Sequence, residues 1–264
     1  MNKFVDFIDD QCFLDCIKSI YIEYEKQKNE YTIKKFYNNQ IDPIKLTFDM
    51  IFSGVSEKEL IEREVQRQMD KNISNFIGHF HEKLLGEIEG FIQKGNAGYD
   101  IKRKDNTLFA EIKNKRNTVN SSSKESTYQK LERFAEEYSD AKCYWVSLIA
   151  PTSYCTQWNQ TFDKTKGPDK MRVYNHPRVY KVSGDYFYEI VTGDSHAFAK
   201  VCKALPRAIE DLLQTQIKYT TEIIDTEDHS HLFSELFNRS QKNGTNILTQ
   251  LFNDNFGHYK GFPI

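Results

Sequence analysis

Apolar residues in the first 95 positions recur at helical intervals. Ser56 and Glu59 stand in capping-box spacing ahead of a long helical run that the pattern carries to about Phe91 and Ile92. Gly95 and Gly98 then end the helical part. The apolar positions of the first helix are Phe4, Val5, Ile8, Phe13, Ile17, Ile20, Tyr21 and Tyr24.

The period of the pattern changes after this helical part. "YDIKR" at 99–103 and "TLFAEIK" at 107–113 place apolar residues at alternate positions, and the turn residues Asp105 and Asn106 separate them. This pattern predicts a β-hairpin. "STYQKLERFAEEYSD" at 126–140 returns to helical spacing, with Ser126 or Thr127 as its cap.

The second half of the chain predicts a buried sheet followed by helices. "CYWVSLIA" at 143–150 is an almost continuous apolar run, as in a strand buried on both faces. "RVYKVS" and "DYFYEIVTG" are interpreted as further strands. Helices are predicted over 196–214, with a kink or restart at Pro206, and over 231–241 and 246–256. This order of elements predicts a mixed α/β core.

Composition narrows the class of protein. The 264 residues, 39% of them hydrophobic and 28% charged, suffice for one large domain or a core with an appended smaller one. The chain has no apolar run of the roughly 20 residues that a membrane span needs, and it has acids where a signal peptide would be apolar. We therefore expect a cytoplasmic protein. The net charge of −2 excludes only a protein that binds nucleic acid by its overall charge.

The predicted hairpin brings three charged residues together. A two-residue turn at Asp105 and Asn106, or a four-residue turn with the same centre, places Asp100 directly opposite Glu111. Lys113, two residues along the strand from Glu111, lies on the same face. The other face receives apolar side chains suited to a core, namely Tyr99, Ile101, Ala110 and Ile112.

Two carboxylates held this close repel each other, and a divalent cation is one remedy. Mg²⁺ is commonly held by one or two carboxylates together with phosphate oxygens of a substrate. Lys113 could orient the attacking water and help to deprotonate it, which is equipment for phosphodiester hydrolysis. The alternative is a solvated hairpin face, because Glu-x-Lys is by itself an unspecific motif.

Several strings in the chain resemble one family of nucleases. They are "GYDI", "AEIKNKRNTVNSSS", "TYQKL" and "TGDSHAFAKVCKALPRAI", and the close match spans residues 72–212. The chain resembles type II restriction endonucleases of the PD-(D/E)XK superfamily, in particular a group that cuts GGNCC sites. Tyr99 departs from the Pro of the superfamily name.

The resemblance implies a restriction-endonuclease-like α/β fold, with a central mixed sheet flanked by helices. A single nuclease domain would fill residues 1–264, with a helical addition at 1–71, the catalytic core at 72–212 and helices at 213–264. The implied activity is Mg²⁺-dependent cleavage of double-stranded DNA, with Mn²⁺ as a substitute, by a homodimer at a palindromic site. A cognate DNA methyltransferase would be a genetic partner and not a subunit.

The resemblance also implies residue roles. Asp100, Glu111 and Ile112 would lie at the metal, and Lys113 would orient the water. Glu82, on the helix before the hairpin, is expected to supply a further acid to the catalytic site.

Contacts to DNA are expected in two regions. Polar residues after the hairpin would hold phosphates, unless they form an ordinary solvated loop: Asn114, Lys115, Asn117, Thr118, Asn120 and Ser121. Gln129 is expected to point toward the site from the next helix. Arg172 and Arg178 are candidates for reading bases, although a charged region of this kind is more often only a loop.

Two other functions fit the same residues. A repair or recombination nuclease would use the same core on DNA ends, junctions or mismatches. A non-catalytic DNA-binding protein would use the hairpin acids structurally. A methyltransferase gene beside this one would separate restriction from repair.

Overall fold

The contacts within the chain divide it into two compact units, 1–14 with 82–264, and 15–81. The structure is a computed structural model that describes residues 2–29, 31–39, 41–93, 98–115, 121–163, 171–216 and 237–264. None of the helices it describes is long and apolar enough to cross a bilayer. The two units are described in turn.

Residues 15–81 are helical, as the spacing of apolar residues predicts. They contain most of α1 (Asp10–Asn29) and α4 (Glu57–Gly86), and all of α2 (Ile33–Asn38) and α3 (Pro43–Ser53). The hydroxyl of Ser56 accepts a hydrogen bond from the Glu59 amide at 3.2 Å, so the predicted cap of α4 is confirmed.

The predicted end of this long helix is wrong. The helix α4 ends at Gly86, and Phe91–Gln93 form the strand β1, which pairs antiparallel with β2 (Ile101–Arg103). Two glycines explain the change of direction. Gly90 adopts a φ of 87°, and a Cβ at Gly86 would lie 2.7 Å from the Cβ of Gln93. Phe91 is then buried as part of the sheet.

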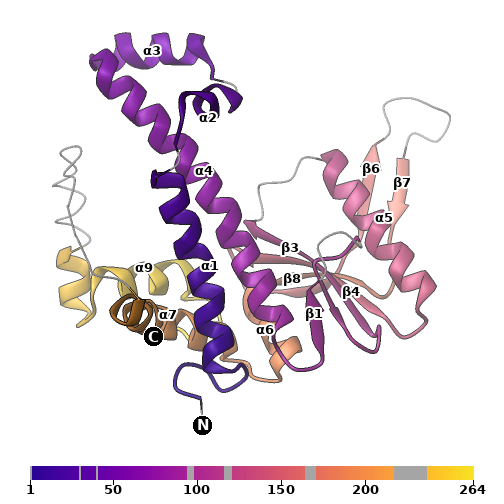
Figure 1. Cartoon of the computed structure of the whole chain (residues 1–264). Coiled ribbons are helices and arrows are strands. Elements are labelled where there is room, and N and C mark those ends of the chain that lie inside the picture. Colours follow the sequence, from indigo (N-terminus) through magenta and orange to yellow (C-terminus); the bar gives the residue numbers. More distant parts are fainter. Residues whose placement is uncertain are drawn as a thin grey trace. The chain divides into compact units, whose positions relative to one another are not determined.

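The larger unit is built on a six-stranded mixed sheet in the order β1-β2-β3-β4-β8-β5 (Figure 1). Its central strands β3 (Leu108–Lys115), β4 (Lys142–Ile149) and β8 (Val179–Ser183) are parallel, while β1, β2 and β5 (Cys155–Gln157) run antiparallel to their neighbours. The predicted mixed α/β core is confirmed.

A short second sheet occupies the region that was expected to be a charged loop. The strands β6 (Gln160–Asp163) and β7 (Met171–Tyr174) pair antiparallel there. Tyr174 is buried and Val173 is 64% exposed, so apolar side chains alternate in their exposure along β7. The strand is short, and Lys and Arg residues around it obscured this alternation in the sequence.

Helix α5 (Ser121–Glu137) packs on one face of the sheet through an aromatic core. Its buried residues Tyr128, Leu131 and Phe134 follow the predicted helical spacing, and the Phe134 ring stacks on Phe109 with centroids 4.5 Å apart. Burial of each such side chain contributes about 1.5–3 kcal/mol. The helix begins at Ser121, before the predicted caps Ser126 and Thr127.

The segment "DYFYEIVTG", predicted as a strand, is the helix α6 (Gly184–Thr192). Its buried residues Gly184, Phe187, Tyr188 and Val191 have helical spacing, which its aromatic and β-branched composition concealed. Gly184 allows the helix to start against β4, where a Cβ would lie 2.5 Å from the Leu148 carbonyl oxygen.

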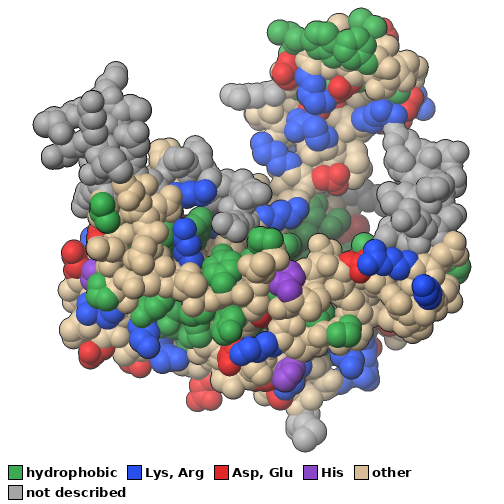
Figure 2. Space-filling model, turned by 180° about the vertical axis from the view of Figure 1, so that it is seen from behind, with side chains coloured by type: hydrophobic (Ala, Val, Ile, Leu, Met, Phe, Trp, Pro, Cys, Tyr) green, Lys and Arg blue, Asp and Glu red, His purple; other side chains and the backbone are tan. Residues whose placement is uncertain are grey.

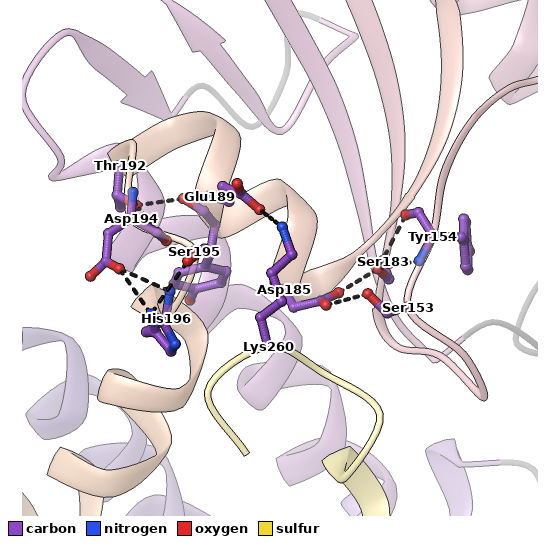
Figure 3. A network of polar contacts seen from close by, with 11 residues as sticks. Ser153, Tyr154, Ser183, Asp185, Glu189, Thr192, Asp194, Ser195, His196 and Lys260 are labelled. Atoms are coloured by element: carbon purple, nitrogen blue, oxygen red, sulfur yellow. Dashed lines mark hydrogen bonds and ion pairs between the residues drawn. The ribbon is translucent and has the colours of Figure 1, made fainter. Parts of the chain in front are cut away.

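Hydrogen bonds fix the start of α6 (Figure 3). The carboxylate of Asp185 is almost completely buried and accepts hydrogen bonds from the hydroxyls of Ser183 and Ser153. The hydroxyl of Ser183 also accepts from the Tyr154 amide at 2.9 Å. This network joins the end of β8 to the chain that follows β4, and leaves the buried carboxylate satisfied.

The C-terminal part of the chain makes hydrogen bonds to the backbone at the end of β4. Helix α7 (Ala197–Gln216) continues through Pro206, so the predicted restart is not observed. The predicted helix at 246–256 is α9 (Ile247–Phe256), and residues 237–242 of the predicted 231–241 helix are helical, while 231–236 lie outside the described residues. The Tyr259 hydroxyl, which follows α9, accepts from the Ala150 amide and donates to the Leu148 carbonyl, both at 2.9 Å.

Candidate active site

The β2–β3 hairpin has the predicted register. Ile101 pairs with Ala110 and Lys102 with Phe109, and a four-residue turn connects the strands. A hydrogen bond of 3.0 Å from the Asn106 amide to the Arg103 carbonyl closes this turn. Asp100 precedes β2, and its amide donates to the Ala110 carbonyl at 2.9 Å, although Ala110 is the ladder partner of Ile101. The described pairing of β2 with β3 therefore ends at Ile101, and it does not place Asp100 directly opposite Glu111. The two carboxylates still lie close enough for the charge of Glu111 to raise the pKa of Asp100.

Asp100 is a carboxylate in an unfavourable environment for its charge. Burial raises the pKa of Asp100 to about 6, and the charges of Glu111 and Glu82 add to this increase. A hydrogen bond of 2.6 Å from the Ile112 amide to Oδ2 of Asp100 and the charge of Lys113 act in the opposite direction. The site concentrates negative charge that a cation would relieve.

Glu111 is a buried carboxylate with a cation on each oxygen. Its side chain is 9% exposed, with Oε1 2.8 Å from Nζ of Lys113 and Oε2 3.0 Å from Nζ of Lys130. Burial alone would raise the pKa of Glu111, but the two lysines outweigh burial and hold this pKa below its usual value. Glu111 is therefore ionised at neutral pH.

Lys113 is held as a cation. Burial would lower the pKa of Lys113, but Glu111, then Asp100 and Glu82, raise it above its usual value. A protonated ammonium donates hydrogen bonds and accepts none. In this arrangement Lys113 can orient a water molecule, and it cannot take a proton from one.

Lys130 was not among the residues predicted from the sequence. It follows Thr127 by three residues and precedes Phe134 by four, and both of these are buried, so helical spacing places Lys130 at the edge of the inner face of α5. That spacing was a usable signal. Gln129, the residue chosen from the same string, is exposed and donates to the Tyr174 hydroxyl at 2.7 Å.

Glu82 lies near the site. It stands in the last turns of α4, and its Oε2 accepts a hydrogen bond of 3.5 Å from Nε2 of Gln93 on β1. Its charge raises the pKa values of Asp100 and Lys113. Glu82 is therefore close enough to contribute to the local field.

The site offers few groups that could bind a metal ion. Among the described residues, no group of three or more His, Cys, Asp and Glu forms a ready metal cluster. Asp100 and Glu111 offer carboxylate oxygens. Ile112 has a buried hydrocarbon side chain and an amide committed to Asp100, so its carbonyl is the group suited to ligation. Hard oxygen donors of this kind fit Mg²⁺.

The expected phosphate contacts follow Lys113. Asn114 is partly exposed and Lys115 is exposed at the end of β3, so both can meet a ligand there. Ser121 is the first residue of α5. Asn117, Thr118 and Asn120 lie outside the described residues.

The structure distinguishes the two arginines chosen as base readers. Arg172 lies on β7, and its role stays a prediction. The guanidinium of Arg178 donates to the carbonyl oxygen of Ala135 on α5, and its amide donates to Nδ1 of His176 at 3.2 Å. These bonds favour a structural role for Arg178.

A mixed sheet with parallel central strands, and a hairpin that carries Asp100 and the Glu111–Lys113 pair, is the core of a restriction-endonuclease-like protein. Comparison with known proteins identifies the family within this class. The chain belongs to the Eco47II restriction endonuclease family, whose model matches residues 5–214.

Two similar proteins are both type II restriction enzymes. The type II restriction enzyme Sau96I of Staphylococcus aureus is 38% identical over 259 residues, which are 97% of this chain and 96% of that enzyme. The type II restriction enzyme Eco47II of Escherichia coli is 29% identical over 219 residues, 81% of this chain and 90% of that enzyme. The resemblance found in the sequence is confirmed, and the chain is a site-specific deoxyribonuclease.

The opposite pKa shifts of the two acids predict opposite effects on stability. The raised pKa of Asp100 means that its ionised form destabilises the folded protein above pH 6. In metal-free buffer at pH 8, Asp100→Asn should increase the free energy of unfolding by about 1–2 kcal/mol, and this gain should vanish as the pH falls toward 4. Glu111→Gln should decrease it at pH 8 by about 1–2 kcal/mol, because two lysines lose their partner.

Urea unfolding with chelator at several pH values measures both effects. Asp140→Asn, at an exposed position in the loop before β4, is the matched control and should change little. A loss of stability in Asp100→Asn at pH 8 would contradict this account of the site.

Proposed function

We propose that this chain is a type II restriction endonuclease that hydrolyses both strands of double-stranded DNA at the palindromic site GGNCC, as a homodimer and with Mg²⁺. Mn²⁺ should substitute for Mg²⁺. Family membership supports the enzyme class. The observation that carries the chemistry is the ion pair of Glu111 with Lys113, at 2.8 Å, together with the charge interaction of both groups with the buried carboxylate of Asp100.

The residues of the site fit Mg²⁺. Asp100 and Glu111, with the Ile112 carbonyl, would hold the ion. Bound there, Mg²⁺ would polarise the scissile phosphate and lower the pKa of a bound water. The raised pKa of Asp100 supports this placement, because the energetic cost of its charge is what a cation removes.

The remaining charged residues would orient the reactants. Lys113 is a cation whose ammonium can donate to the attacking water or to a phosphate oxygen. Glu82 would accept a hydrogen bond from a water at the edge of the site. Asn114 and Lys115 would contact the DNA backbone beyond the scissile bond, together with Asn117, Thr118, Asn120 and Ser121.

The recognition site rests on the string "AEIKNKRNTVNSSS" and its resemblance to enzymes that cut GGNCC. Arg172 is the proposed reader of guanine, because an arginine can bond both O6 and N7 of that base. Incubation with Mg²⁺ and a long DNA of known sequence, followed by sequencing of the product ends, should give ends only at GGNCC. Ends at another fixed site would replace GGNCC, and ends at random positions would overturn site-specific cleavage by this chain.

The proposed catalytic unit makes a second test possible. Glu111→Gln keeps the shape of the side chain and removes a ligand charge, and Lys113→Ala removes the water-orienting cation. Each should slow cleavage of a GGNCC duplex roughly 100- to 1,000-fold, while binding of the duplex persists. Asp140→Asn should cleave at the unchanged rate. If both Glu111→Gln and Lys113→Ala cleave at near-normal rates, the hairpin acids are structural.

An exposed surface within residues 15–81 supports the proposed dimer. Ile44, Phe48, Ile51 and Phe52 on α3 are between 54% and 81% exposed, and α3 has no buried residue. Figure 2 shows hydrophobic side chains gathered at this helix. Lys45 and Asp49 on the same helix neutralise each other, so the surface has no charge to attract DNA. A second copy of the chain, acting on a two-fold site, suits it.

Charges placed on this surface should therefore prevent dimer formation. Phe48→Asp with Phe52→Asp should convert a dimer to a monomer in size-exclusion chromatography with light scattering, and should leave the circular dichroism spectrum unchanged. Ile22→Asp, at a 54% exposed position on α1, is the control. A dimer that persists in the double variant would place the interface elsewhere, and a monomeric unmodified protein would argue against the dimer itself.

A further inference from the structure

The carboxylate of Glu111 binds a second lysine in addition to the lysine of its own strand. Lys113 lies two residues along β3, whereas Lys130 comes from α5 and reaches Oε2 at 3.0 Å. Both ammonium groups are about one third exposed, and the carboxylate between them is 9% exposed. The ion pair with Lys130 is therefore formed at the edge of a buried site, where solvent screens it less than it screens a surface pair.

The position of Lys130 is fixed by the core. Its neighbours Tyr128 and Leu131 are fully buried against the sheet, and the Tyr128 hydroxyl accepts a hydrogen bond of 2.7 Å from the His176 amide. The Lys130 backbone cannot move away without disturbing this packing. The fixed backbone thus keeps the Lys130 ammonium within reach of Glu111.

We propose that Lys130 is a positioning residue for the cleavage reaction, which orients Glu111 through Oε2 and lowers the affinity of the site for its metal. The inference rests on the proposed Mg²⁺ site. With Lys130 on Oε2, Oε1 of Glu111 would be the oxygen left for the proposed metal, once Lys113 turns to the water or the phosphate. Lys130 thereby occupies Oε2 and leaves Oε1 as the oxygen that would bind the ion.

This arrangement has two opposed consequences. A cation a few ångströms from a divalent ion repels it, so Lys130 should weaken metal binding. The same ammonium restricts the rotation of Glu111, so it should increase the rate at saturating metal. A residue that only fastened α5 to the sheet would not have opposed effects, because its loss would weaken metal binding and cleavage together.

The experiment uses the whole chain without DNA and measures the melting temperature over a titration with Mg²⁺ alone. Lys130→Met and Lys130→Gln remove the charge, and Lys130→Arg keeps it. Lys142→Met removes a charge from an exposed position at the amino end of β4 and is the matched control. Glu111→Gln should abolish the increase in melting temperature that Mg²⁺ causes.

Both neutral variants should bind Mg²⁺ about 3- to 10-fold more tightly than the unmodified chain, because one repulsive charge is lost. With DNA and saturating Mg²⁺, Lys130→Met, which cannot donate to Glu111, should cleave about 10-fold more slowly. Lys130→Arg should keep the Mg²⁺ affinity within about twofold, since the charge remains. Lys142→Met should change neither quantity.

Unchanged or weaker Mg²⁺ binding in Lys130→Gln, or in Lys130→Met, would overturn the inference while the proposed metal site stands. If Lys130→Met does not fold, Lys130→Gln decides, because its amide can still donate to Glu111. If the unmodified chain shows no stabilisation by Mg²⁺ at all, the proposed metal site itself fails, and the inference fails with it.

Discussion

The balance of charge around the carboxylate of Glu111 is the constraint on which the site depends. Glu111 is buried beside Asp100, an arrangement that is unfavourable unless positive charge lies close by. The structure supplies this charge from two elements, Lys113 on β3 and Lys130 on α5. The hairpin register and the packing of α5 are therefore both needed to keep one carboxylate ionised in the core.

The aromatic core beneath α5 fixes the positions of the elements that carry these charged groups. Phe109 precedes Glu111 by two residues on the same face of β3 and stacks on Phe134 of α5. Trp145, the β4 partner of Glu111, stacks on Trp158 with ring centroids 4.5 Å apart. Rigid rings on both sides leave the charged groups little freedom, and a site that must hold reacting atoms within a fraction of an ångström requires such support.

The sequence predicted the parts of the molecule that local periodicity determines. The pairing of Ile101 with Ala110 and of Lys102 with Phe109 could be predicted because strand alternation and the turn centre fix the register. The position of Asp100 could not, because its amide bonds to Ala110 and leaves that register. The strand β1 and the helix α6 were missed because tertiary context decides them: Phe91 needs β2 as a partner, and Gly184 matters only because β4 lies against it. Lys130 was missed because its partner is 19 positions away, on another element.

The same charges would make DNA binding at the proposed site depend on its metal. Asp100, Glu111 and Glu82, with Lys113 and Lys130, sum to one negative charge when all are ionised, so the site without metal repels a phosphodiester. One divalent cation turns this sum positive, and one phosphate then neutralises it. If Lys130 carried no charge, the proposed ion would bind more tightly, but the loaded site would be neutral and would no longer attract the phosphate. The second lysine would thus couple binding of the proposed metal to binding of DNA, because the site would favour the phosphate only after the metal has entered.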